Sequence, residues 1–110
     1  MRRAIIPQIN VLFRVKVKAG LEDEFYKLAV EMAASTRSED EGWITFIYHH
    51  HTSDANDFFL YEQWRDRDAL TAHLDRLKAV YGPVRDGGFL PASLMDFWDD
   101  VQIDMYNVVE

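Results

Sequence analysis

The sequence predicts an α+β protein in which an antiparallel sheet of four strands carries two helices on one face. Three observations support this fold class. Apolar and polar side chains alternate near both ends of the chain, and two aromatic-rich segments flank a turn in the middle. After the first and the third predicted strands, apolar residues recur every three or four positions, as in a helix. The chain has 110 residues, the usual length of one domain. We therefore expect residues 1–110 to form a single unit, with 1–8 as an N-terminal extension and 83–110 as a variable tail.

The first strand is predicted over residues 9–18, where apolar side chains occupy every second position. After Ala19-Gly20 the apolar spacing changes to three and four residues, which predicts an amphipathic helix that begins at Leu21 and ends within 35–38. The acidic residues 22–24 favour this helix because negative charge in a first turn complements the helix dipole.

Residues 43–50 and 58–64 are rich in aromatic and β-branched side chains, and turn-forming residues 52–57 separate them. This pattern predicts two strands joined by a hairpin loop, with His51 paired near Asp57. A register shifted by one or two residues satisfies the same pattern. In the expected register, one face of the sheet carries Ile44, Phe46, Tyr48 and His50 beside Phe58, Leu60, Glu62 and Trp64.

A second long helix is predicted over residues 67–81, and Gly82-Pro83 ends it because glycine caps helices well and proline cannot continue them. A short helix is expected within 90–98, and alternation within 101–106 predicts the closing strand. The resulting order, βαββαβ with one added short helix, is that of the ferredoxin-like arrangement. The apolar stripe of the second helix consists of Leu70, His73, Leu74, Leu77, Val80 and Tyr81.

The sheet face opposite the helices is expected to be apolar as well. Leu12 lies on it, together with either Phe46 or Ile47 and either Phe58 or Phe59, whichever register holds. An apolar face of this size is typical of a subunit interface. We therefore expect a symmetric homodimer in which the two sheets pack against each other.

Composition and charge exclude several classes of protein. A net charge of −7 and a pI near 5 argue against binding to nucleic acid or to anionic membranes, which need clustered positive charge. No stretch approaches the ~20 apolar residues of a membrane-spanning helix. The absence of cysteine excludes disulfides and thiolate metal sites and, together with the lack of a visible targeting signal, favours the cytoplasm.

Metals and nucleotide cofactors are not expected. The adjacent histidines 49–51 alternate across the faces of a strand and cannot converge on one ion. No glycine-rich phosphate loop follows a strand. Any chemistry therefore depends on histidine, on a carboxylate and on the substrates.

Several motifs resemble the antibiotic biosynthesis monooxygenase family, and its quinol monooxygenases most closely. They are residues 13–20, Glu41-Gly42, Tyr61-Glu62-Gln63-Trp64 and residues 69–74. The resemblance covers roughly residues 9–82. It implies a dimeric α+β barrel and, in several members, oxidation of phenols or quinols by O₂ without metal or flavin.

Three side chains are candidates for proton transfer. His73 lies on the apolar stripe of the second helix, where it acts as a general base or is a core histidine bonded to a backbone carbonyl or to Glu62. His50 matches the pocket histidine of the family members that oxidise aromatic polyketides. Glu62 can act as a base if burial raises its pKa, and pairs with Arg65 or Arg67 if it is exposed.

The remaining candidates are expected to bind the substrate. Trp64 matches a tryptophan of those monooxygenases, and its indole N–H can donate to a substrate carbonyl or to a developing peroxide; as a residue at a strand end it fits the core equally well. Leu60 and Leu70 stand where these monooxygenases have an asparagine and a tyrosine, which predicts a more apolar pocket and a different substrate. The expected binding residues are Trp64, Tyr48, Leu60, Leu70, Tyr81 and Trp98.

The leading functional hypothesis is a cofactor-independent monooxygenase that oxidises a small phenolic or quinol-type aromatic substrate with O₂. Two alternatives come from other classes. One is a non-catalytic dimer that binds a small ligand or has a regulatory role; its histidines are then structural. The other is a cofactor-free isomerase or cyclase that acts on a polyketide-like ketone with the same base.

Overall fold

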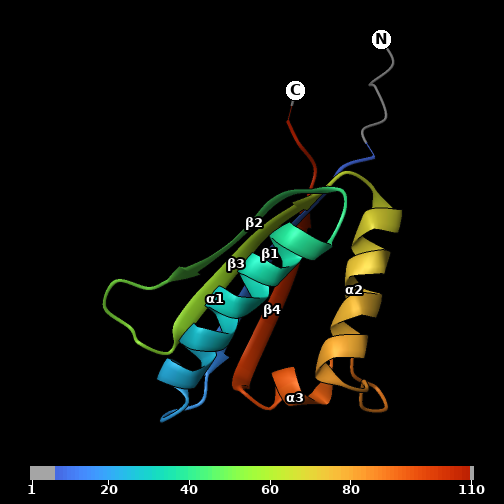
Figure 1. Ribbon diagram of the computed structural model, residues 1–110. Coiled ribbons are helices and arrows are strands. Elements are labelled where there is room, and N and C mark those ends of the chain that lie inside the picture. The colour runs from blue at the N-terminus through green and yellow to red at the C-terminus, as the bar shows by residue number, and fades with distance from the viewer. Residues whose placement is uncertain (1–6, 110) are drawn as a thin grey trace.

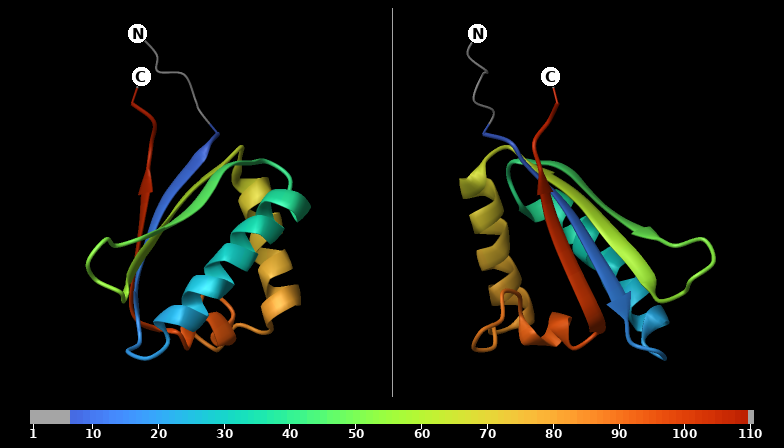
Figure 2. Two further views of the ribbon diagram at one scale, coloured as in Figure 1. Left: turned by 60° about the vertical axis from the view of Figure 1, so that its left-hand side comes forward. Right: turned by 180° about the vertical axis from the view of Figure 1, so that it is seen from behind.

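The computed structural model describes residues 7–109 as one sheet and three helices (Figure 1). The strands pair antiparallel in the order β2-β3-β1-β4, and α1 and α2 lie on the same face of the sheet (Figure 2). The ferredoxin-like α+β fold and its βαββαβ order are confirmed; residues 1–6 of the expected extension lie outside the described range. The elements are β1 (Ile9–Val17), α1 (Glu22–Glu39), β2 (Trp43–His50), β3 (Asp57–Trp64), α2 (Arg67–Tyr81), α3 (Ala92–Met95) and β4 (Trp98–Tyr106).

The tail after α2 contains less helix and more strand than the sequence predicts. The short helix occupies only Ala92–Met95, with Pro91 before its first turn. Strand β4 begins at Trp98 rather than at residue 101, because Trp98 already pairs with Val17 of β1. This early start buries the Trp98 side chain beneath the helices, where 7% of it is exposed.

The hairpin has the expected register. The His51 amide donates to the Asp57 carbonyl at 2.9 Å, and Tyr48 pairs with Leu60. The exception is Ile44, which was expected on the helix side and is 47% exposed. The pairing shifts by one residue between positions 43 and 45, and such a bulge turns the extra residue out of the alternation.

Phe25 of α1 is the centre of the core. Its side chain is fully buried and meets the rings of Tyr48, Phe58, Phe97 and Trp98 with centroid distances of 5.0 to 5.9 Å. Three of these contacts are edge-to-face, an arrangement that aromatic quadrupoles favour. Phe25 therefore connects α1 to β2, β3 and the start of β4.

The sheet face opposite the helices is open in the single chain (Figure 2). The register assigns Ile47 and Phe59 to this face, 49% and 36% exposed, and turns Phe46 and Phe58 into the core. Leu12 shares the open face and is half-buried. These side chains provide the apolar surface that the sequence predicts.

Gly42, between α1 and β2, has a backbone conformation that only glycine adopts readily. Its φ is +80°, and an added Cβ would lie 2.6 Å from Cβ of Ala69. Gly42→Ala is therefore expected to lower the free energy of unfolding by about 2–4 kcal/mol, through left-handed strain and the clash with α2. Urea denaturation measures the loss.

Gly20→Ala is the matched control, because Gly20 also has a positive φ, +91°, but no atom lies within 4 Å of the added Cβ. Gly20→Ala is expected to lower the free energy of unfolding by about 1 kcal/mol, through left-handed strain alone. Equal losses for the two variants would show that the close approach of Gly42 to α2 contributes nothing.

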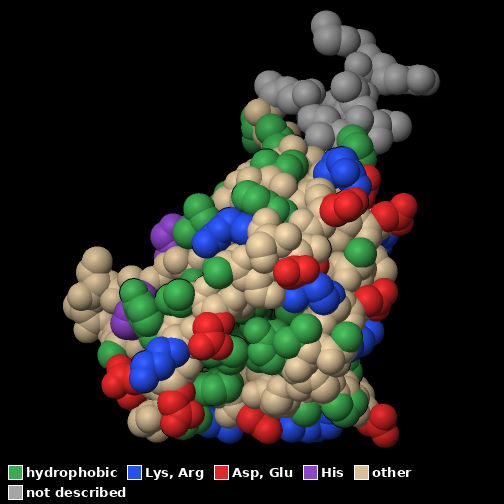
Figure 3. Space-filling view, viewed as in Figure 1, with side chains coloured by type: hydrophobic (Ala, Val, Ile, Leu, Met, Phe, Trp, Pro, Cys, Tyr) green, Lys and Arg blue, Asp and Glu red, His purple; other side chains and the backbone are tan. Residues whose placement is uncertain are grey.

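Acidic and basic side chains alternate over the helical face of the molecule, without a single-sign basic patch (Figure 3). Within residues 7–109, no helix has both the length and the apolar character needed to cross a membrane.

Candidate functional site

A cavity of about 190 Å³ lies between the helices and the sheet. Every strand and helix contributes to its wall, from Val11 and Phe13 of β1 to Leu94 of α3 and Trp98 of β4. The wall is mostly apolar. At the rim, Phe89, Ile103 and Met105 are each more than 40% exposed, so the route into the cavity runs between β4 and the loop before α3.

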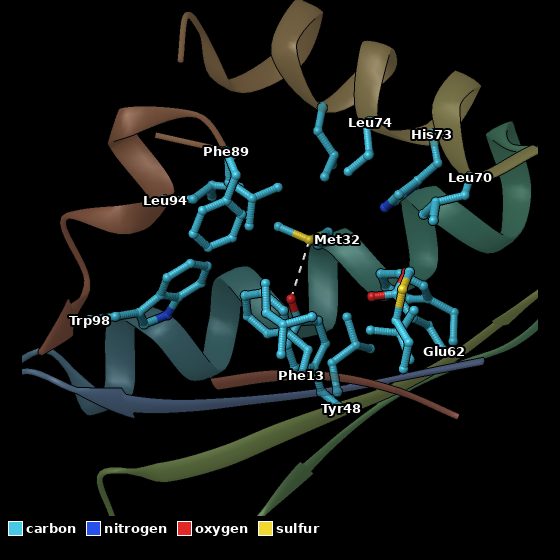
Figure 4. A pocket seen from close by; sticks show the side chains of 17 residues that line it. Phe13, Met32, Tyr48, Glu62, Leu70, His73, Leu74, Phe89, Leu94 and Trp98 are labelled. Atoms are coloured by element: carbon cyan, nitrogen blue, oxygen red, sulfur yellow. Dashed lines mark hydrogen bonds between the residues drawn. The ribbon is translucent and has the colours of Figure 1, made fainter. Parts of the chain in front are cut away.

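The polar side chains of the wall come from four elements, and one of them, Trp98 of β4, has a buried Nε1–H that no described residue bonds. Figure 4 shows His73 projecting from α2 at the same end of the cavity as Glu62 of β3, while Trp98 and Phe89 lie at the other end. Tyr48 of β2 contributes a hydroxyl that contacts Sδ of Met32 at 3.4 Å. The cavity is thus an apolar chamber with its two proton-exchanging groups at one end.

Glu62 is held by its neighbour two residues along β3. Nε1 of Trp64 donates to Oε1 of Glu62 at 2.6 Å, and the Glu62 side chain lines the cavity (Figure 4). Burial raises the pKa of Glu62 to about 7, against the opposing effect of the Trp64 bond. Near neutral pH this carboxyl can therefore either give or take a proton.

The raised pKa predicts a pH-dependent stability. Protonated Glu62 is the form that the fold prefers, so its contribution to stability is full below pH 4.5 and is lost as the pH rises through 7. Relative to Glu62→Gln, the free energy of unfolding of the wild type should fall by about 3 kcal/mol across this range. Urea denaturation at a series of pH values measures the difference. Glu41→Gln, which removes an exposed carboxylate, controls for net charge, and parallel curves for wild type and Glu62→Gln would contradict the prediction.

His73 is 3% exposed and packs between two rings. Its imidazole lies 4.6 Å from the ring of Trp64 and 5.2 Å from that of Phe46. Burial lowers the pKa of His73, although the neighbouring Asp40 carboxylate opposes this shift, so the ring is neutral at pH 7. Because Nδ1 contacts Asp40, Nε2 is the ring nitrogen left to face the cavity, into which the His73 ring points (Figure 4).

Two further residues belong to the site, and the sequence did not indicate them. Nδ1 of His73 lies 2.6 Å from Oδ2 of Asp40, the residue that caps the C-terminus of α1. Nε of Arg76 donates to Oδ1 of the same carboxylate at 2.6 Å. The only local signal was the position of Arg76, one helical turn after His73; nothing distinguished Asp40 from its acidic neighbours.

The cavity brings together most of the expected site residues. It is lined by His73, Glu62, Tyr48, Leu60, Leu70 and Trp98. Three others lie elsewhere. Trp64 is fully buried behind the wall with its N–H engaged by Glu62, and Tyr81 lies in a separate groove beside Leu28 and Phe97.

His50 is the third, and it does not line this cavity. The strand face is as predicted, but His50 lies two pairs beyond Tyr48, past the end of the cavity. Its exposed ring stacks on Phe58 at 4.1 Å and bonds the Ala55 carbonyl at 2.9 Å. It shares an outer groove with Tyr26.

No group of three His, Cys, Asp or Glu side chains within residues 7–109 is placed to hold a metal ion. His73 and Glu62 give the cavity two groups that can exchange a proton with a bound molecule.

A ferredoxin-like sheet and its helices thus enclose an apolar cavity, with a histidine and a carboxyl at one end, in a small α+β protein. Residues 8–78 match the family model described as antibiotic biosynthesis monooxygenase. The chain belongs to that family.

Similarity to individual proteins extends the comparison. An uncharacterised protein of Synechocystis sp. is 34% identical over 65 residues, which span 59% of this chain but only 44% of that protein. PA3566 of Pseudomonas aeruginosa superposes with a TM-score of 0.74 at 18% identity, over 97% of this chain and 100% of that one. A candidate antibiotic biosynthesis monooxygenase of Nitrosomonas europaea superposes with a TM-score of 0.75 at 16% identity, over 98% of this chain and 96% of that one. These structures have the same fold.

Proposed function

We propose that this protein is a monooxygenase that oxidises a small phenol or quinol with O₂, without a cofactor of its own. The observation that carries the proposal is the buried, neutral His73, whose free Nε2 lies in an apolar cavity. A phenol is a weak acid, and a base held within hydrogen-bond reach of its hydroxyl can take its proton. Membership of the family supports the same reaction class.

The reaction balances with the groups present and two substrates. The phenol hydroxyl gives its proton to Nε2 of His73, and the phenolate transfers one electron to O₂. The two radicals combine at an unsubstituted ring carbon, and the proton returns from His73 to give a hydroperoxide. Cleavage of its O–O bond with loss of the ring C–H proton releases water. One phenol and one O₂ thus yield one quinone and one water.

The size and polarity of the cavity favour a one-ring or two-ring substrate. An apolar cavity of about 150 Å³ is known to bind benzene, and drug-sized ligands need about 300 Å³ or more, so 190 Å³ suits a small aromatic molecule. Leu60 and Leu70 offer it no hydrogen bond. His73 and Glu62 offer polar contacts at one end of the cavity, and the unpartnered Nε1–H of Trp98 offers one at the other.

The test is turnover of a panel of naphthols and hydroquinones, followed by O₂ consumption and quinone absorbance. We expect one O₂ consumed per quinone formed, and no quinone under anaerobic conditions. Product formation that persists without O₂ would refute the oxygenase.

The pair of proton-exchanging groups supports a second candidate, an isomerase of a small aromatic ketone. His73 would remove a proton next to the carbonyl while protonated Glu62 donates to the carbonyl oxygen. Anaerobic deuterium exchange into such ketones, observed by NMR, detects this activity. Binding of the panel without any turnover would support a ligand-binding protein instead.

We further propose a homodimer through the open sheet face, within the cytoplasm. Ile47 and Phe59 are exposed there in the single chain, and apolar side chains clustered on one face are typical of an interface. Phe59→Asp should convert the dimer to a monomer in sedimentation velocity, because it places a charge within the contact. Val30→Asp, on the helical side and 57% exposed, is the control. A monomeric wild type, or a dimer unaffected by Phe59→Asp, would contradict this arrangement.

A further inference from the structure

Asp40 connects the cavity histidine to the end of α1. Its side chain is 7% exposed, and each of its oxygens accepts a bond of 2.6 Å, from Arg76 at Oδ1 and from His73 at Oδ2. Nη2 of Arg76 makes a further bond to Oδ2 at 3.2 Å. Three hydrogen bonds thus hold this buried carboxylate, and one of them comes from the candidate base.

The protonation of Asp40 follows from these donors. Burial on its own would raise the pKa of Asp40, but hydrogen bonds from Arg76 and His73 outweigh it and hold this pKa below its usual value. Asp40 is therefore an ionised carboxylate, which accepts hydrogen bonds and donates none. Its partner on His73, Nδ1, must carry the proton.

A neutral imidazole has a single N–H. Since Nδ1 holds it, Nε2 has the lone pair, and Nε2 is the nitrogen on the cavity side. A half-turn of the ring about its Cβ–Cγ bond would put Cδ2 in the place of Nδ1 and lose the bond to Asp40. The hydrogen bond to Asp40 thus determines both the tautomer and the orientation of His73.

Arg76 fixes Asp40 in turn. Besides its bonds to the carboxylate, its guanidinium donates to Oγ of Ser35 at 2.8 Å, on the last turns of α1. Ser35 and Asp40 belong to the end of α1, and His73 and Arg76 belong to α2. The cluster therefore joins the two helices at the point where the base enters the cavity.

We propose that Asp40 is a positioning residue that fixes His73 in its Nδ1–H tautomer and so presents Nε2 to the substrate as a base, with Arg76 holding Asp40 in place. This role rests on the proposed function of His73, but the tautomer itself is a property of the protein without substrate.

Asp40→Asn is the sharpest variant because it keeps the shape and removes the charge. The guanidinium of Arg76 only donates, so it takes the amide oxygen and leaves the amide N–H₂ facing Nδ1 of His73. The histidine must then accept at Nδ1 and carry its proton on Nε2. A base of the wrong tautomer cannot take the substrate proton, and the corresponding change in serine proteases lowers kcat by about 10⁴-fold.

The experiment is two-bond ¹H–¹⁵N correlation NMR of the ¹⁵N-labelled protein, which distinguishes the two neutral tautomers. We expect a protonated Nδ1 and a bare Nε2 in the wild type, and the reverse in Asp40→Asn. Asp66→Asn is the control; it removes a carboxylate from the N-cap of the same helix, which bonds the Ala69 amide and not His73, and should leave the tautomer unchanged.

Two results would overturn the proposal. One is an Nε2–H or doubly protonated His73 in the wild type at pH 7, a measurement that does not depend on the folding of any variant. The other is a folded Asp40→Asn protein that retains the Nδ1–H tautomer. With a substrate from the panel, kcat of Asp40→Asn should fall by about 10²- to 10⁴-fold with little change in KM. An Nδ1–H tautomer in a protein that turns over no substrate would refute the monooxygenase and leave the role of Asp40 intact.

Discussion

His73→Asn is expected to lower kcat for phenol oxidation by about 10²- to 10⁴-fold, the usual contribution of a general base. The asparagine amide can replace Nδ1 as the donor to Asp40, so the buried carboxylate keeps its partner. It offers no basic nitrogen at the position of Nε2. Steady-state kinetics of O₂ consumption, with far-UV circular dichroism to confirm folding, measure the effect.

His50→Asn is the matched comparison, since His50 was the other histidine expected in the pocket. Its ring is exposed and stacks on Phe58 outside the cavity, so we expect kcat within about twofold of the wild type, a change of about 0.4 kcal/mol in the barrier. Loss of activity in His50→Asn with retention in His73→Asn would move the reaction to the outer groove and contradict the assignment of the cavity.

Phe25→Ala is expected to cause the largest loss of stability among single substitutions in the core. The side chain is fully buried and contacts four aromatic rings, and truncation of such a residue costs about 3–5 kcal/mol through lost burial and the remaining cavity. A domain of this size has about 5–15 kcal/mol of stability in total. Urea denaturation should show a much lower midpoint.

Val30→Ala, on the same helix, is the control. Val30 is 57% exposed, and its truncation should cost less than about 1 kcal/mol. A loss for Phe25→Ala no greater than that of Val30→Ala would mean that the core is not organised around Phe25.

The fold could be predicted largely because its signals are local. A period of two or of 3.6 depends on residues close in sequence, and these periods placed α2 at its observed bounds and β1 within one residue. The hairpin register followed from the turn residues between β2 and β3. The bulge at Ile44 and the early start of β4 could not be predicted, because each arises from pairing with a distant strand.

The candidate site was predictable only in part, for the same reason. Periodicity indicates which face a residue occupies, and it placed His73, Glu62 and Tyr48 on the faces that enclose the cavity. It does not indicate where along a strand the cavity ends, so His50 was expected in a pocket that stops before it. Trp64 has the correct face, but its bond to Glu62 keeps it behind the wall.

The sequence alone thus determined the order of the elements, the faces they bury and the family to which the chain belongs, since each is encoded in spacing and in short motifs. Only the tertiary structure decided the chemistry of the site. The pKa of Glu62 depends on how completely packing removes water from it. The orientation of His73 depends on Asp40, 33 residues earlier. The contact between Asp40 and His73 forms only because the end of α1 packs beside α2. No pattern of neighbouring residues in the sequence indicates that packing.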